Sequence, residues 1–222
     1  MRAVAALLLA GGLLVGLPQA AVAQESCNGN PATVVGTPGG AIVGTTDRDV
    51  VVTNGAASVD TLDGIDVMCV TGALPNSLDG GAGRDRVVIA LPGTFVRLDL
   101  GRSLEVGDAT SAVAGFEDAT VRAHSLNVDG TIGPNDLRWN ACVGTVTAQR
   151  GSDGSSWAGG SNLCGPGEDH GVGVFGGGGK DRLSGSPWAD ILIGGRGFDR
   201  GDGRGGIDRC RVERPRNCEL DR

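Results

Sequence analysis

The sequence predicts an all-β fold, a parallel β-solenoid (β-roll) that is stapled by disulfides. Composition is the first reason: the 222 residues include 41 glycines, no tyrosine, four phenylalanines and three tryptophans. Average glycine usage is about 7%, and large aromatic side chains normally fill the centre of a layered domain. A glycine-rich chain with few aromatics suits a narrow core. The second reason is a nonapeptide repeat, which distinguishes the chain from an aperiodic, disordered one.

The first 23 residues are typical of a secretory signal peptide. Residues 1–23 contain Arg2, then an apolar run, and end in a small-x-small cleavage site at 21–23. We expect the mature chain to begin at Gln24. No later stretch approaches the roughly 18 apolar residues of a spanning helix. The sequence therefore predicts a secreted, extracellular protein without membrane insertion.

The charge of the chain favours cations as partners. There are 26 acidic and 19 basic residues, and the formal net charge is −7. Such a chain is a poor binder of nucleic acid and of anionic membranes. Solubility alone would explain the net charge, but it would not explain the regular positions of the aspartates.

Those positions form a tandem repeat near the C-terminus. From residue 176 the chain reads GGGGKDRLS, GSPWADILI, GGRGFDRGD and GRGGIDRCR, with aspartate sixth in each nonapeptide. An isolated copy, GGAGRDRVV, occupies residues 80–88. The first and third repeats and the isolated copy match the pattern GGxGxDxUx at every glycine and at the aspartate, and the chain resembles the RTX, or hemolysin-type calcium-binding repeat, family.

The resemblance implies calcium, Ca²⁺, as the bound cofactor. Glycine turns leave carbonyl oxygens free, the aspartate adds a carboxylate, and calcium takes six to eight oxygen ligands. The first three repeats contain no His or Cys, so a zinc or copper site is not indicated there. The candidate calcium ligands are Gly80, Gly81, Gly83, Asp85, Gly176, Gly177, Gly179, Asp181, Asp190, Gly194, Gly195, Gly197, Asp199 and Asp208.

In this family two nonapeptides form one turn of the solenoid. Carried onto this chain, Asp181 and Asp199 would share one row of loops, and Asp190 and Asp208 the other. The eighth position of each repeat, such as Leu183, would point into the core, and the seventh would point outward. The second repeat departs from the pattern, because Ser186 and Trp188 stand where glycine is expected. We expect this loop to be distorted or weakened.

Six cysteines in a secreted chain predict three disulfides, for which fifteen connectivities exist. Residues near in sequence stay near in space in a solenoid, so local pairing is favoured. We expect Cys27–Cys69, Cys142–Cys164 and Cys210–Cys218.

The rest of the chain divides by composition. Residues 24–90 contain eroded repeats, and most of their loops lack glycine. We favour plain turns that bind no metal for all of them except the loop of Asp85. The predicted segments are a signal peptide (1–23), a degenerate repeat region (24–90), a solenoid continuation without calcium loops (91–150), a Gly/Ser-rich loop (151–175), the tandem repeats (176–211) and a C-terminal cap (212–222).

Motifs of common enzymes are absent from the sequence. It has no HExxH helix, GxSxG elbow or Walker loop, so we expect no enzyme and assign no catalytic residue. Two alternatives to a calcium-binding module remain. One is a metal-independent structural or adhesive solenoid, and the other is a polysaccharide-acting protein on the same scaffold. Contact with a cell surface or a polysaccharide stays open.

Overall fold

The computed structural model describes residues 25–168 and 170–219, and these residues form strands and turns without any helix. The prediction of an all-β fold is confirmed. The predicted signal peptide lies outside the described residues. Within the described ranges there is no helix with the length and apolarity needed to cross a membrane.

One row of strands pairs in parallel along the described part of the chain. We call it row A, and each member pairs with the next in chain order. Its strands are β3 (Val34–Val35), β5 (Val50–Val52), β8 (Val67–Val70), β11 (Arg86–Asp99), β14 (Asp118–Asp129), β15 (Asp136–Asn140), β18 (Gly154–Trp157), β20 (Arg182–Ser184), β22 (Arg200–Asp202) and β24 (Arg214–Arg216).

A second row, row B, lies beside it in two parallel groups that β12 (Ser103–Val106) and the second halves of β11 and β14 connect. The first group is β4 (Ala41–Val43), β6 (Ser58–Asp60), β9 (Ser77–Asp79) and β13 (Ala109–Ala114). The second group is β16 (Val143–Thr147), β19 (Gly171–Gly179), β21 (Ile191–Gly197) and β23 (Arg209–Arg211). The remaining strands are β1 (Ser26–Cys27), β2 (Asn30–Pro31), β7 (Asp63–Gly64), β10 (Ala82–Gly83) and β17 (Arg150–Gly151).

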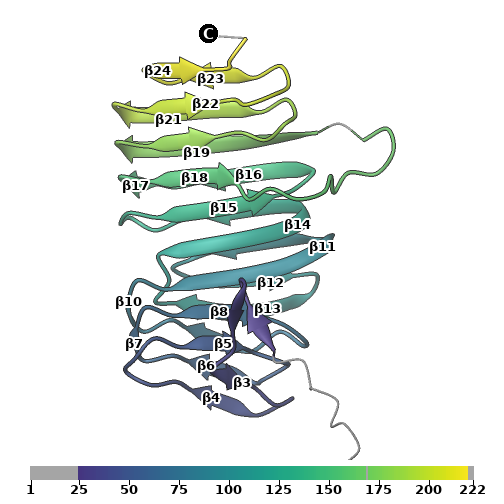
Figure 1. Cartoon of the computed structure of the whole chain (residues 1–222), viewed down its shortest axis with the longest axis vertical. Coiled ribbons are helices and arrows are strands. Elements are labelled where there is room, and N and C mark those ends of the chain that lie inside the picture. Colours follow the sequence, from purple (N-terminus) through teal and green to yellow (C-terminus); the bar gives the residue numbers. More distant parts are fainter. Residues whose placement is uncertain (1–24, 169, 220–222) are drawn as a thin grey trace, which may run out of the picture.

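The strands form a stack that follows the sequence. Figure 1 shows them as rungs along the long axis, from β3 and β4 at one end to β23 and β24 at the other. In the repeat block Arg182 pairs with Arg200, and the matching hydrogen bond spans 18 residues. Two nonapeptides therefore advance the chain by one rung.

The core lies between the two rows as ladders of stacked side chains. In row A, Val51 pairs with Met68, and Met68 with Val87; in row B, Val174 pairs with Leu192. All five are buried. Vertical stacking of like side chains removes apolar area from water on every rung, which is the main favourable contribution to folding.

The inward positions of the repeats agree with expectation. Leu183, Leu192, Gly201 and Cys210 are buried, whereas Arg182, Arg200 and Arg209 are exposed. Gly201 contributes no side chain to the core. The side chain of Val212 fills this place, since a Cβ on Gly201 would stand 3.1 Å from a Val212 methyl carbon.

All three expected disulfides are present: Cys27–Cys69, Cys142–Cys164 and Cys210–Cys218. The first attaches β1 to β8, and the last closes the end of the stack by linking β23 to the C-terminal segment. Three disulfides indicate an oxidising environment.

Two expected segments differ from the structure. The Gly/Ser-rich loop predicted for 151–175 is shorter, because it contains β18 and the first residues of β19. The region 91–150 does not only continue the parallel stack, since β12 pairs antiparallel with both β11 and β13. Gly107, at φ 59°, forms the two-residue turn between β12 and β13, a conformation that glycine adopts without steric cost.

Candidate cation-binding loops

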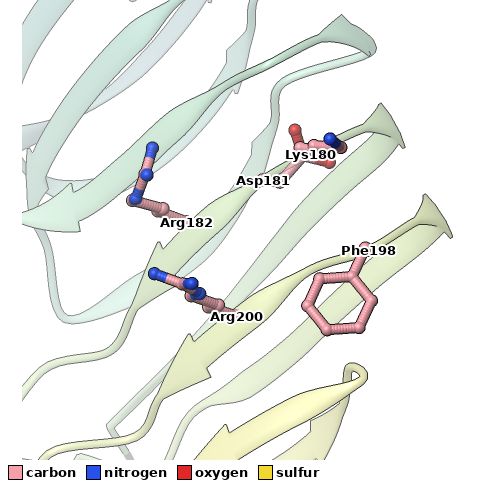
Figure 2. A pocket seen from close by; sticks show the side chains of 5 residues that line it. All are labelled: Lys180, Asp181, Arg182, Phe198 and Arg200. Atoms are coloured by element: carbon pink, nitrogen blue, oxygen red, sulfur yellow. The ribbon is translucent and has the colours of Figure 1, made fainter.

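The four repeat aspartates point inward at the turns. Asp181, Asp190, Asp199 and Asp208 are between 0 and 3% exposed. Neighbouring residues point outward because side chains alternate along extended backbone. Figure 2 shows this around Asp181: Arg182 lies above Arg200 on the adjacent strand, and Phe198 lies nearby.

One oxygen of each carboxylate links two rungs. The N–H of Asp181 donates to Oδ1 of Asp199 at 3.0 Å, and the N–H of Asp190 donates to Oδ1 of Asp208 at 2.8 Å. The repeat predicted two stacks of loops, one with Asp181 and Asp199 and one with Asp190 and Asp208, and both are present. A carboxylate that accepts a buried backbone N–H satisfies a donor that would otherwise be costly to bury.

The stack of loops that contains Asp181 continues beyond the repeat. The N–H of Asp153 donates to Oδ1 of Asp181 at 3.0 Å. In the N-terminal part, the N–H of Asp66 donates to Oδ1 of Asp85 at 2.7 Å. Asp66 and Asp153 were not among the ligands predicted from the sequence, because their loops lack the motif.

The second oxygen of six aspartates has no partner. Among the described residues, no donor reaches these buried Oδ2 atoms. Burying a carboxylate oxygen without a hydrogen bond or a cation is costly, so the arrangement fits a bound cation. The six residues are Asp66, Asp85, Asp153, Asp181, Asp199 and Asp208.

These six turns share one backbone conformation, and we call them open loops. In each, the residue four before the aspartate has a φ between 66° and 102°, and the glycine two before it has a φ between 104° and 152°. The first set is Leu62, Gly81, Gln149, Gly177, Gly195 and Arg204. The second set is Gly64, Gly83, Gly151, Gly179, Gly197 and Gly206. The glycine two before the aspartate was the signal available in the sequence for the two missed loops.

Three other turns on the rungs have a different arrangement, and we call them capped loops. In the second repeat, the N–H and the hydroxyl of Ser186 donate to Oδ2 of Asp190 at 2.6 and 2.8 Å. Thr45 makes the same two bonds to Asp49, at 2.7 and 3.0 Å. The third capped loop has Asn135 in place of aspartate, and the N–H of Thr131 donates to its Oδ1 at 2.8 Å.

The capped loop of the second repeat bears on a predicted ligand. Both carboxylate oxygens of Asp190 accept hydrogen bonds from the protein itself. Ser186 does not merely weaken the loop, as expected from the sequence. Its N–H and hydroxyl contact Oδ2 of Asp190, the oxygen that has no partner in the open loops. Asp190 therefore differs from the other repeat aspartates.

In four of the six open loops, a glycine five positions before the aspartate leaves space for its carboxylate. A Cβ on Gly194 would collide with Oδ2 of Asp199, and one on Gly176 would collide with Oδ2 of Asp181. The point where the Gly176 Cβ would stand is also 2.7 Å from the carbonyl oxygen of Gly194, on the next rung. Carboxylate and carbonyl oxygens from two rungs thus converge here, which is the oxygen-only ligand set that calcium prefers.

Burial also changes the acidity of the open-loop carboxyls. Desolvation raises the pKa of Asp85, Asp153 and Asp208 to about 6. The negative charge of the neighbouring Asp66 adds to the effect on Asp85. Burial likewise raises the pKa of Asp66 and Asp181. These carboxyls are therefore costly to ionise in the absence of a cation.

A second group of potential metal ligands lies near the segment between β18 and β19. Ligand atoms of His124, Cys142 and Glu168 lie within 4.8 Å of one another. However, the sulfur of Cys142 is bonded to Cys164 and cannot act as a thiolate ligand. His124 and Glu168 alone, 3.5 Å apart, form a partly exposed pair.

No family model matches the chain, and no curated protein sequence is similar to it.

Proposed function

We propose that the chain is a secreted calcium-binding protein, a β-roll of the RTX type whose Gly/Asp-rich turns hold the ions. The observation that carries this proposal is the set of buried Oδ2 atoms without donors in the motif loops, such as those of Asp181 and Asp199. The predicted signal peptide and the three disulfides support secretion.

Parallel pairing supports the β-solenoid. Each rung of the repeat block follows the previous one after 18 residues in both rows. Buried ladders of like side chains run between the rows, and two nonapeptides per rung is the arrangement that the family resemblance implies.

The ligand chemistry favours calcium over other cations. The motif loops offer carboxylate and backbone carbonyl oxygens, without nitrogen or sulfur ligands. Calcium accepts six to eight such oxygens in flexible geometry, whereas magnesium demands a near-ideal octahedron and usually keeps several waters. Glycines in the left-handed region, such as Gly177 at 99° and Gly195 at 102°, orient the carbonyls.

Calcium binding would be coupled to folding. The carboxyls of Asp181 and Asp199 lie one rung apart in a dry environment, so without a cation they repel each other and lose hydration. A bound calcium ion supplies the compensating positive charge. Because the site forms only when the rungs are stacked, the free energy of binding stabilises the folded state. An affinity of about 10⁻⁴–10⁻³ M, usual for extracellular modules, would order the chain outside the cell.

A calcium titration of the purified chain after exhaustive chelation tests the proposal. We expect calcium at submillimolar to millimolar concentrations to increase the β-structure seen by far-UV circular dichroism and to raise the Tm of the partly folded calcium-free chain, with binding heat in calorimetry. Magnesium at the same concentrations is the control, and it should have little effect. A spectrum already rich in β-structure in chelator, with no heat upon calcium addition, would contradict the proposal.

The capped loops favour a second candidate, a metal-independent structural or adhesive β-solenoid. Thr45 and Ser186 satisfy Asp49 and Asp190 without an ion, so part of the stack needs no calcium. The same titration separates the two candidates, since this one predicts a fold that is indifferent to chelator.

A further inference from the structure

Two of the open loops lie outside any recognisable motif. The loop before Asp66 reads TLDGID, and the loop before Asp153 reads AQRGSD. Each has leucine or glutamine where the motif has its second glycine, and Thr61 or Ala148 where it has its first. Each nevertheless has a buried Oδ2 without a hydrogen bond in the described part of the chain. Burial raises the pKa of Asp66 and the nearby Thr61 hydroxyl lowers it, but this hydroxyl donates its hydrogen bond to the carbonyl oxygen of Gly80, at 3.0 Å.

The loop of Asp153 stacks on a motif loop in the same register as two motif loops stack on each other. Gly151 of β17 pairs with Gly179 of β19, as Gly179 pairs with Gly197 of β21. The aspartates repeat this relation. The N–H of Asp153 donates to Oδ1 of Asp181, and the N–H of Asp181 donates to Oδ1 of Asp199, both at 3.0 Å.

The isolated N-terminal motif also has a neighbour of this kind. Gly64 of β7 pairs in parallel with Gly83 of β10. The N–H of Ala82 donates to the carbonyl oxygen of Leu62 at 2.9 Å, and Asp66 donates to Asp85 at 2.7 Å. The motif loop of Asp85, although isolated in the sequence, therefore stacks on a second open loop, that of Asp66.

Backbone spacing is equally close in all these pairs. A Cβ on Gly197 would collide with the carbonyl oxygen of Gly179, the relation between two motif loops. The carbonyl of Gly151 would meet a Cβ on Gly179 in the same way, and that of Gly64 would meet a Cβ on Gly83. The backbone spacing at the glycine two before the aspartate is thus alike with and without the motif.

The residues that replace glycine are held in the glycine conformation. Leu62 has a φ of 66° and Gln149 a φ of 73°, values that side chains rarely adopt. The Gln149 carbonyl accepts the N–H of Gly178 at 2.9 Å, and its side-chain amide donates to the carbonyl of Gly130 at 2.5 Å. The neighbouring rungs therefore impose the open conformation on a sequence that does not favour it.

We propose that Asp66 and Asp153 complete two further calcium sites, one between the loops of Asp66 and Asp85 and one between those of Asp153 and Asp181. This inference rests on the proposed calcium function. With the pair of Asp181 and Asp199, the chain then has three sites between adjacent open loops; the open loop of Asp208 stacks on the capped loop of Asp190 and is not among them.

The same hydrogen bonds define where each run of open loops ends. The capped loop of Asp49 precedes Asp66, and its N–H donates to Oδ1 of Asp66 at 2.7 Å. Beyond Asp85, a glutamate takes the place of an aspartate, since the N–H of Asp85 donates to Oε2 of Glu117 at 3.0 Å.

The second run has the same boundaries. The N–H of capped Asn135 donates to Oδ1 of Asp153 at 2.8 Å, and the N–H of Asp199 donates to Oε2 of Glu213 at 2.8 Å. A hydroxyl or N–H donor thus replaces the ion on the N-terminal side, and a glutamate carboxylate closes the C-terminal side.

Ion counting on the whole purified chain tests the inference. We expect calorimetry and native mass spectrometry to show three calcium ions for the wild type and one ion fewer for each of Asp66→Asn and Asp153→Asn. Asparagine keeps the Oδ1 acceptor, and circular dichroism at saturating calcium checks the fold. Asp190→Asn is the matched control: it lies in a capped loop of the same repeat block and should keep the wild-type count.

The outcomes separate the two proposals. If Asp66→Asn and Asp153→Asn keep all ions while Asp199→Asn loses one, the inference is wrong and the calcium function stands. If the wild type binds no calcium, the proposed function itself is wrong. Anomalous diffraction from wild-type crystals grown with calcium needs no variant: we expect peaks beside Asp66 and Asp153, and peaks beside Asp181 and Asp199 alone would overturn the inference.

Discussion

The N–H of Asp181 donates to Oδ1 of Asp199 at 3.0 Å, although the two residues are 18 positions apart in the sequence. Each such aspartate therefore has two tasks. Its Oδ1 fixes the register of the preceding rung, and its Oδ2 faces the space between the rungs. Because one side chain serves both, loss of the aspartate should affect the stacking and the ion together.

Gly194, five before Asp199, should be important for calcium binding in its own loop. In Gly194→Ala, the new Cβ would collide with Oδ2 of Asp199, so we expect calcium affinity to fall at least about tenfold, equivalent to about 1.4 kcal/mol. Gly178→Ala is the control, because its Cβ would meet only a carbon of Arg150, at 4.0 Å. Calorimetric titration of both variants checks this, and equal affinities would contradict it.

Removing the Ser186 hydroxyl should destabilise the protein with or without calcium. Ser186→Ala deprives Oδ2 of Asp190 of a 2.8 Å hydrogen bond in a buried place, which costs about 1–3 kcal/mol. Urea unfolding in chelator and in calcium should give the same loss. Ser103→Ala, at a half-buried position in β12, should change stability by less than about 0.5 kcal/mol. A loss for Ser186→Ala seen only with calcium would mean that Asp190 binds the ion.

Acid should stabilise the calcium-free protein. Burial gives Asp85 and Asp153 a folded-state pKa of about 6, above the usual aspartate value of 3.8. The folded state thus binds more protons between pH 4 and 6, and the cost of ionising these groups, complete above pH 6, disappears as the pH falls toward 4. We expect the calcium-free Tm to rise from pH 7 to pH 5.

With saturating calcium the pH dependence should reverse, because protons then compete with the ion for the same carboxyls. Thermal unfolding followed by circular dichroism, with and without calcium, measures both trends. A calcium-free Tm that falls upon acidification from pH 7 to pH 5 would show that the buried carboxyls are not costly to ionise.

Leu62 should be replaceable by glycine with a gain in stability. Its φ of 66° costs roughly 1–2 kcal/mol for a residue with a Cβ, and its side chain is 36% exposed, so little packing is lost. We expect Leu62→Gly to raise the free energy of unfolding by about 1 kcal/mol. Leu62→Ala keeps the strain and should not stabilise; equal effects of the two variants in urea unfolding would argue against backbone strain.

Much of the repeat block could be predicted from sequence. The family resemblance implied that Leu183 faces inward and that two nonapeptides form one turn, and strand alternation then places Arg182 outward. Local pairing of cysteines in a stacked chain also led to the observed disulfides. In each case the relevant information lies within about two rungs of the residue concerned.

The open loops of Asp66 and Asp153 could not be predicted in the same way. Leucine and glutamine disfavour a positive φ, so Leu62 and Gln149 argue locally against an open turn, and only the adjacent rung imposes it. The role of Ser186 was missed for a related reason: a departure from glycine suggested weakness, whereas the donors it offers depend on where the Asp190 carboxylate lies. The antiparallel pairing of β12 likewise depends on its neighbours in the stack.

The positions of the capped loops imply an order in which the rungs form. The rungs at Asp49 and Asn135 have their hydrogen bonds without an ion, so each can form first and present a finished edge to the loop that follows. The rungs of each run would then become ordered one after another, from the capped loop on the N-terminal side to the glutamate on the C-terminal side. A chain that leaves the cell N-terminus first would meet external calcium in the same order.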